Sequence, residues 1–254
     1  MTIKTYTVNG VATIEIARPE KKNAITQDMY QAMADALRAA DADKTVRAVL
    51  ITGQPGIFTS GNDLEDFMGR PPRGEDAPVF QFMHALLDCS KPVVAAVTGA
   101  AIGIGTTLLL HCDLVFVADD ARLAMPFVGL GLVPEFASSL VVPQLMGNRR
   151  AAEKLLLGDP FTGEQAVECG IANRVLPGSE VVNHARRIAE RFNHLAPGAV
   201  RESKQLIREP QREAVKAAIA REAQIFSARL RSPEAMEAFQ AFFQKRVPDF
   251  SKFD

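Results

Sequence analysis

One carboxylate, Glu135, lies alone in an otherwise uncharged stretch of the sequence, GLVPEFASS at residues 131–139. Burying a carboxylate in apolar surroundings is costly in free energy, and its pKa rises because water no longer stabilises the charge. A carboxylate whose pKa lies near the working pH can act as a general base. The alternative is a structural role, in which the dipole of a helix that begins after Pro134 stabilises the charge.

Three glycines, Gly99, Gly103 and Gly105, form a turn in VTGAAIGIG at residues 97–105, between a predicted strand and a predicted helix. Glycine lets a backbone pass close to a ligand, and the first N–H groups of a helix favour negative charge. Gly99 alone could serve close packing of a helix on a strand. The three glycines together favour a turn that faces a ligand.

A second turn, GIFTSGNDLEDF at residues 56–67, follows the predicted strand RAVLITG. Ligands in open α/β sheets bind beyond the carboxyl ends of the strands, so this turn lies where a site is expected. Taken alone, SGND is an ordinary turn in which Asp63 caps the following helix. Its significance comes from its combination with the first turn.

The first turn also resembles the cofactor loop of the short-chain dehydrogenases, TGxxxGIG. In that family the loop follows the first strand, whereas here it begins near residue 98. The family's Tyr-xxx-Lys pair is missing as well, because Gly10 and Ala34 stand four residues after the only tyrosines, Tyr6 and Tyr30. The sequence therefore argues against a dehydrogenase of this kind.

Two other enzyme classes are poorly supported. The histidines are scattered, and HCD at residues 111–113 spans a predicted helix-to-strand junction, so we expect His111 to be structural rather than a metal ligand. The G-x-S-x-G motif of serine hydrolases occurs around none of Ser60, Ser138 and Ser139. No metal site is predicted.

The elements that must position these residues alternate short strands with helices. Runs that are apolar at consecutive positions predict strands at residues 11–17, 47–53, 91–99 and 112–119. Helical spacing, with Thr26, Thr162 and Ser232 as capping residues, predicts helices at residues 26–41, 106–112, 162–170, 179–195 and 232–246. The recurring order strand, strand, helix predicts an α/β (α+β) core, and after about residue 145 the pattern becomes helical.

Composition limits the class of protein and its partners. The chain has 254 residues, 47% hydrophobic and 23% charged, with a net charge of −1. These values predict one sizeable core and argue against nucleic acid or an anionic membrane as the main partner. No apolar stretch reaches the ~18 residues of a membrane span. The odd number of cysteines, widely spaced, argues against a disulfide framework and predicts a cytoplasmic protein with buried thiols.

Five segments together make the chain resemble the crotonase superfamily, the enoyl-CoA hydratases and isomerases. They occur in the family's order and spacing over essentially the whole chain, at residues 18–26, 47–64, 91–119, 129–139 and 161–175. The resemblance implies a spiral of repeated strand-strand-helix units over residues 1–197 that carries an acyl-CoA site. It also implies a helical oligomerisation region at residues 198–254, through which related enzymes form trimers or dimers of trimers.

The resemblance implies an oxyanion site made of two backbone N–H groups, which receive the thioester oxygen of an acyl-CoA when an enolate forms. By position, these groups belong to Asn62 and Ile104. Charge that develops on oxygen needs preorganised donors, and the loss of one costs about 3 kcal/mol of barrier. No cofactor is expected other than the coenzyme A that forms part of the substrate.

Further substrate contacts follow from the same resemblance. The residues expected at the CoA and acyl groups are Lys22, Ala24, Ser60, Gly61, Asp63, Leu64, Gly103, Gly105, Phe242 and Lys245, with Phe127, Leu132 and Phe136 as walls of the acyl pocket. Lys245 could equally be a solvated lysine at the end of a helix.

The reaction itself is predicted from the acids that are present and absent. Related hydratases hold and split a water molecule with two glutamates, but those positions are Thr107 and Phe127 here. Glu135 instead matches the single glutamate of the Δ3,Δ2-enoyl-CoA isomerases, which moves one proton from C2 to C4 in a dry pocket. The sequence therefore predicts an isomerase. The alternatives are a hydratase with an unusual water site, another enolate reaction and a non-catalytic acyl-CoA-binding homologue.

Overall fold

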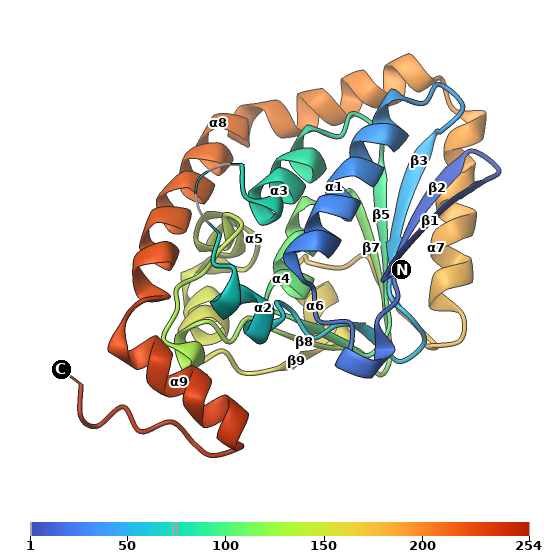
Figure 1. Ribbon diagram of the computed structural model, residues 1–254. Coiled ribbons are helices and arrows are strands. Elements are labelled where there is room, and N and C mark those ends of the chain that lie inside the picture. Colours follow the sequence, from blue (N-terminus) through green and yellow to red (C-terminus); the bar gives the residue numbers. More distant parts are fainter. Residues whose placement is uncertain (1, 73, 75, 254) are drawn as a thin grey trace.

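The computed structural model describes residues 2–72, 74 and 76–253, and it contains two sheets (Figure 1). The first sheet has six strands in the order β1-β2-β3-β5-β7-β10. They are β1 (Ile3–Val8), β2 (Val11–Ile16), β3 (Ala48–Thr52), β5 (Val93–Val97), β7 (Leu114–Ala118) and β10 (Arg174–Leu176). The second sheet has the order β4-β6-β8-β9, made of β4 (Ile57–Thr59), β6 (Ala100–Ile102), β8 (Arg122–Ala124) and β9 (Phe161–Thr162).

Successive strands of the chain are divided between the two sheets. β3, β5 and β7 pair in parallel in the first sheet, and the strands that follow them, β4, β6 and β8, pair in parallel in the second. Only β1–β2 and β8–β9 are antiparallel among the described pairs. Each strand-strand unit thus adds one strand to each sheet, which confirms the predicted repeat and its α/β class.

Helices cover the first sheet on both faces. Figure 1 shows α1 (Gln27–Ala42) and α3 (Pro78–Asp88) on one side of the strands and α7 (Val181–Glu190) on the other. The Oγ1 atom of Thr26 accepts a hydrogen bond from the Met29 amide and caps α1, as predicted. The strands β3 and β5 are buried along their whole length because both faces are covered.

The remaining helical segments have at most six residues each, except one of 15 residues. They are η1 (Pro19–Lys21), α2 (Leu64–Gly69), α4 (Ile104–Thr107), η2 (Leu108–His111), η3 (Val128–Leu130), α5 (Ser138–Ala152), η4 (Glu153–Leu157), α6 (Gly163–Glu168) and η5 (Arg191–His194). The Thr162–Gln165 capping box of α6 is present as predicted. The helical prediction after residue 145 was incomplete, because β9 and β10 also lie there and extend both sheets.

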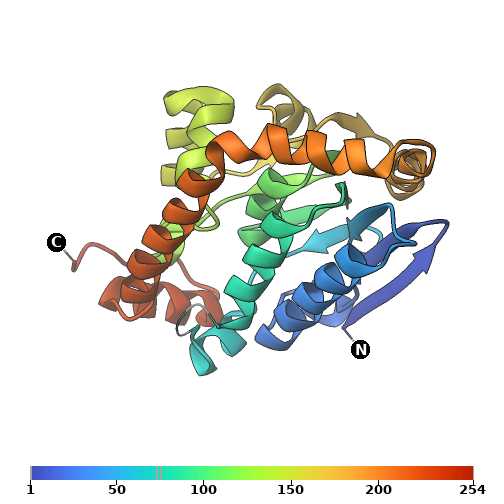
Figure 2. The same cartoon turned by 90° about the horizontal axis from the view of Figure 1, so that it is seen from above.

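The C-terminal residues form α8 (Pro197–Arg229) and α9 (Pro233–Gln244), with Ser232 as the predicted cap of α9. Figure 2 shows α8 running across the molecule and then turning down toward α9. Lys204 and Arg208 of α8 form ion pairs with Asp113, which lies directly before β7, at 2.7 and 2.8 Å. α8 is therefore held against the core of its own chain, and its predicted role in oligomerisation stays a prediction.

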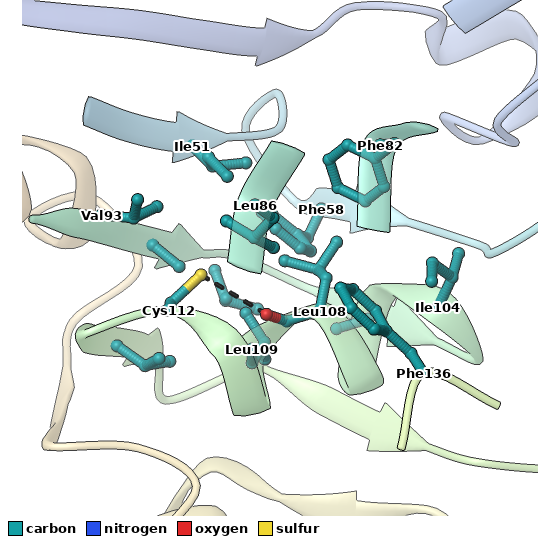
Figure 3. Packing of buried hydrophobic residues seen from close by; sticks show 14 of the residues in the cluster. Ile51, Phe58, Phe82, Leu86, Val93, Ile104, Leu108, Leu109, Cys112 and Phe136 are labelled. Carbon is teal, nitrogen blue, oxygen red and sulfur yellow. Dashed lines mark hydrogen bonds between the residues drawn. The ribbon is translucent and has the colours of Figure 1, made fainter. Parts of the chain in front are cut away.

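The core packs apolar side chains from the strands, α3 and the segment after the first glycine turn. Figure 3 shows Phe58, Phe82, Ile104 and Phe136 converging on this cluster. The three cysteines are free and buried, as expected. Burial raises the pKa of the Cys112 thiol to about 12, so this thiol stays protonated and unreactive.

Two further findings concern partners. None of the helices in the described residues combines the length and the apolar character that a membrane-spanning segment requires. Within the described part of the chain, no three His, Cys, Asp or Glu side chains come together in a way that could hold a metal ion.

We expect Gly99 to be essential where the chain passes from β5 in the first sheet to β6 in the second. It has φ +63°, and a Cβ added to it would lie 1.8 Å from the carbonyl oxygen of Gly56. We expect Gly99→Ala to lower the free energy of unfolding by at least about 2 kcal/mol, because the backbone strain adds to the clash. Urea denaturation measures the loss. Gly198→Ala, on α8 with no atom within 4 Å of the added Cβ, is the matched control and should be close to neutral; equal stability of the two variants would contradict the prediction.

Candidate active site

A pocket of about 780 Å³ opens where the two glycine turns meet the C-terminal helices. Of the residues predicted from the sequence, it is lined by Lys22, Ala24, Ser60, Gly61, Asn62, Asp63, Leu64, Gly103, Phe127, Leu132 and Phe242. The structure therefore brings together residues from both turns, from the segment before α1 and from α9. This volume lies within the range of pockets that bind small organic molecules and cofactors.

The two turns touch through their glycines. Gly61 has φ +93°, and a Cβ there would lie 2.8 Å from the Ile102 carbonyl oxygen. A Cβ on Gly105 would lie 2.5 Å from the Cγ2 atom of Thr59. Larger residues at either position would push the turns apart, so the glycines set the separation of the two backbones.

The backbone N–H groups of Asn62 and Ile104 remain free for a ligand. In the described part of the chain, neither amide donates a backbone hydrogen bond, although the neighbouring Asp63 and Gly103 amides bond to Ile25 and Ala124. Ile104 is the first residue of α4, where an N–H has no partner inside the helix. Asn62 lines the pocket, and Ile104 directly follows Gly103, which lines it too. Two unpaired amides placed in this way can stabilise a negatively charged oxygen.

Asn23, which sequence reasoning missed, fixes the strip of backbone at Lys22 and Ala24. Its side chain is fully buried, donates to the carbonyl oxygens of Ile57 and Phe58 and accepts from the Arg18 amide. The Ser60 amide in turn donates to the Lys22 carbonyl oxygen at 3.1 Å. The sequence signal was only the residue type, because asparagine tolerates the left-handed backbone that it adopts here, φ +56°.

Asp63 holds the second turn rather than acting as an acid. One oxygen accepts from the Asp66 amide and caps α2, and the other pairs with the Arg18 guanidinium at 2.6 Å. Burial raises the pKa of Asp63, but the hydrogen bonds and charge of Arg18 outweigh burial and hold the pKa below its usual value. The predicted helix cap is confirmed.

Glu135 is buried in apolar surroundings, 7% exposed. Its Oε1 atom accepts a hydrogen bond from the Thr107 hydroxyl at 2.7 Å. Burial raises the pKa of Glu135 to about 8, against the opposing effect of that hydrogen bond, and the charge of Glu222 raises it further. Such a carboxyl group gains and releases a proton near neutral pH, as a general base must.

Glu135 lies behind an aromatic pair that separates it from the large pocket. It lines a cavity of about 20 Å³, whose other walls include Phe67 and Phe226. These two rings also line the large pocket, and they meet edge to face with centroids 6.1 Å apart. A ligand chain that passes the two rings would therefore reach the carboxylate.

Three predicted contact residues, Gly105, Phe136 and Lys245, are not among the residues that line the large pocket. Phe136 lines the small cavity instead, and its ring stacks on His111 at 4.0 Å. Lys245 is exposed at the end of α9 and is not among the lining residues. His111 donates through Nε2 to the Phe136 carbonyl oxygen, and burial lowers its pKa to about 4, as suits the structural role expected for it.

Sequence reasoning also missed Tyr30 and Glu222. The Tyr30 hydroxyl donates to the Oδ1 atom of Asn62, and burial together with the charge of Glu135 raises the pKa of this phenol. Glu222, on α8, is buried beside Glu135. Neither had a local signal, because their partners are distant in the chain.

Comparison with known proteins agrees with this geometry. The family model for enoyl-CoA hydratase/isomerase matches residues 6–252. The chain belongs to this family of the crotonase superfamily. Its fold therefore follows from its family.

Members of the enoyl-CoA hydratase/isomerase family with different reactions are similar to this chain. Human enoyl-CoA delta isomerase 2 is 35% identical over 245 residues, and the match spans 94% of this chain but only 62% of the human protein. Escherichia coli 2,3-dehydroadipyl-CoA hydratase is 30% identical and matches over 94% of each chain. The crystal structure of an enoyl-CoA hydratase/isomerase from Pseudoalteromonas atlantica superposes with a TM-score of 0.94 at 40% identity, covering 98% of this chain and all of the other.

Proposed function

We propose that the protein is a Δ3,Δ2-enoyl-CoA isomerase that uses Glu135 as its single base. The observation that carries the proposal is the buried carboxyl of Glu135, whose pKa is raised to about 8 and whose partner Thr107 stands where related hydratases have a glutamate. Phe127, at the other such position, is buried and lines the pocket. Neither of these two positions carries an acid, so the proton transfer falls to Glu135, which suits isomerisation without water.

The proposed mechanism moves one proton and needs no cofactor beyond the coenzyme A of the substrate. A 3-enoyl-CoA binds with its thioester oxygen at the amides of Asn62 and Ile104. The Glu135 carboxylate removes a proton from C2, and the electrons spread into a dienolate whose charge rests largely on that oxygen. Glu135 then returns the proton to C4, and the product is the conjugated trans-2-enoyl-CoA.

Hydration is the second candidate, because the E. coli relative is named a hydratase and a second carboxyl group, Glu222, lies beside Glu135. Hydration by two acids needs both to hold one water molecule. The two oxygens of Glu222 already accept hydrogen bonds from the amides of Ala137 and Ser139. Because these bonds occupy Glu222, it is poorly placed to hold a water molecule, which favours isomerisation over hydration.

Product analysis with two thioesters tests the proposal. With 3-hexenoyl-CoA we expect conversion to the trans-2-enoyl product, seen by the absorbance of the conjugated thioester. With crotonyl-CoA we expect hydration to be at least about 100-fold slower than the isomerisation of 3-hexenoyl-CoA, because neither hydratase glutamate position carries an acid. Rapid hydration of crotonyl-CoA would favour the hydratase, and binding of both thioesters without turnover would favour a non-catalytic homologue.

A further inference from the structure

Glu222 connects the C-terminal helix α8 to the turn that carries Glu135. Its Oε2 atom accepts from the Ala137 amide at 2.6 Å, and its Oε1 atom accepts from the Ser139 amide at 2.9 Å. The side chain is 6% exposed. These bonds join residues more than 80 positions apart in the sequence.

The turn after Glu135 needs an outside partner to keep its shape. Phe136 and Ala137 both have φ +57°, a left-handed conformation that costs free energy for residues with a Cβ. Ala137 stands at the cap position of α5 and has no side chain that could accept from the free amides there. Glu222 supplies the missing acceptor, and its negative charge also suits the start of a helix.

The same carboxylate places a charge near the base. Glu135 and Glu222 line one small cavity, and neither has a Lys or Arg ion-pair partner in the part of the chain that the structure describes. The Thr107 hydroxyl from α4 donates to Glu135, and the charge of Glu135 in turn raises the pKa of the Tyr30 phenol from α1. His111, which bonds to the same turn at the Phe136 carbonyl oxygen, is neutral. Glu222 is therefore the one charged neighbour of the base among the described residues.

We propose that Glu222 is a positioning residue that holds the turn carrying Glu135 and keeps a second negative charge beside that base. This inference rests on the proposed role of Glu135. Both oxygens of Glu222 are bonded to amides, so Glu222 acts through Glu135 and does not itself take the proton. A second negative charge favours the protonated form of Glu135 and makes its carboxylate the stronger base.

Two substitutions separate the charge from the structural support. Glu222→Gln removes the charge and keeps one acceptor oxygen, whereas Glu222→Asp keeps the charge and shortens the side chain. The measurement is kcat/KM for 3-hexenoyl-CoA between pH 5.5 and 9.5, which reports the ionisation of the free enzyme. In the native protein we expect a rise with pH and a midpoint near 8, where Glu135 loses its proton.

We expect Glu222→Gln to move this midpoint to lower pH by roughly half a unit or more. Glu222→Asp should leave the midpoint in place and lower the plateau, because its shorter side chain holds the turn less well. If both variants lower the plateau and keep the native midpoint, the charge has no role and the inference is wrong. Circular dichroism of each variant checks that the fold is retained.

A measurement on the native protein covers the case in which Glu222→Gln does not fold. Carbon-13 NMR of glutamate-labelled protein follows the two carboxyl groups, assigned with Glu135→Gln. We expect them to titrate as a coupled pair, and the titration of Glu222 to move to lower pH in Glu135→Gln. Independent titration would overturn the inference. A different result would contradict the proposed function itself, namely isomerisation of 3-hexenoyl-CoA by Glu135→Gln.

Discussion

Glu135→Gln should reduce kcat for isomerisation of 3-hexenoyl-CoA on the order of 10³-fold, because the neighbouring acid, Glu222, is bonded to amides through both oxygens and does not carry the proton. Glutamine has the same shape, and its carbonyl oxygen can still accept from the Thr107 hydroxyl, which lies 2.7 Å from Oε1 in the native protein. The pocket for the thioester therefore stays intact. Calorimetry with a non-reactive acyl-CoA should give a nearly native Kd.

The same substitution should remove a stability cost at high pH. Burial raises the pKa of Glu135 from an ordinary 4.5 to about 8 in the folded protein. A group whose folded pKa is raised contributes stability at low pH, and this contribution is lost as the pH rises toward the folded pKa. The free energy of unfolding of Glu135→Gln, relative to that of the native protein, should therefore rise between pH 5 and pH 9. Urea denaturation at both pH values measures this change.

Glu168→Gln is the matched control, since Glu168 is exposed at the end of α6. It should change neither kcat nor the free energy of unfolding by more than a small amount. Substantial turnover by Glu135→Gln would take the base role away from Glu135. Loss of acyl-CoA binding in that variant would show instead that the substitution had disturbed the pocket.

Ile104→Pro should lower kcat by roughly 10²–10³-fold, since it deletes one of the two proposed oxyanion donors, worth about 3 kcal/mol of barrier. Ile104 is the first residue of α4, a position that proline fits because its N–H has no helical partner there. The preceding residue is Gly103 at φ +58°, whose freedom of backbone conformation limits the strain. The amide can thus be removed with the helix kept.

Ile104→Val is the control, because it keeps the amide and shortens a fully buried side chain. It should cost about 1 kcal/mol of stability and leave kcat within a few-fold of native. Stopped assays with 3-hexenoyl-CoA measure both variants, and circular dichroism confirms their fold. A folded Ile104→Pro protein with native kcat would show that this amide does not hold the thioester oxygen.

Much of the fold could be predicted because its signals are local. Continuous apolar runs marked β3, β5 and β7, and capping residues such as Thr26 and Ser232 marked helix starts. β9 and β10 were missed because two or three residues carry too little pattern to be distinguished from the helices around them. Asn23 was missed because its value lies in buried hydrogen bonds to Ile57 and Phe58, more than 30 residues away.

The sequence by itself determined the glycine turns and the solitary acid Glu135, since these depend on residue type and spacing. The placing of Thr107 and Phe127 at the positions of the hydratase glutamates came from the family resemblance and stays a prediction. Only the tertiary structure decided what surrounds the acid. Thr107 bonds to it across 28 positions, and Glu222 and Phe226 reach it from α8. The physical reason is that burial and charge at one carboxyl depend on every segment packed around it, and the path of α8 back over the core is set by long-range packing.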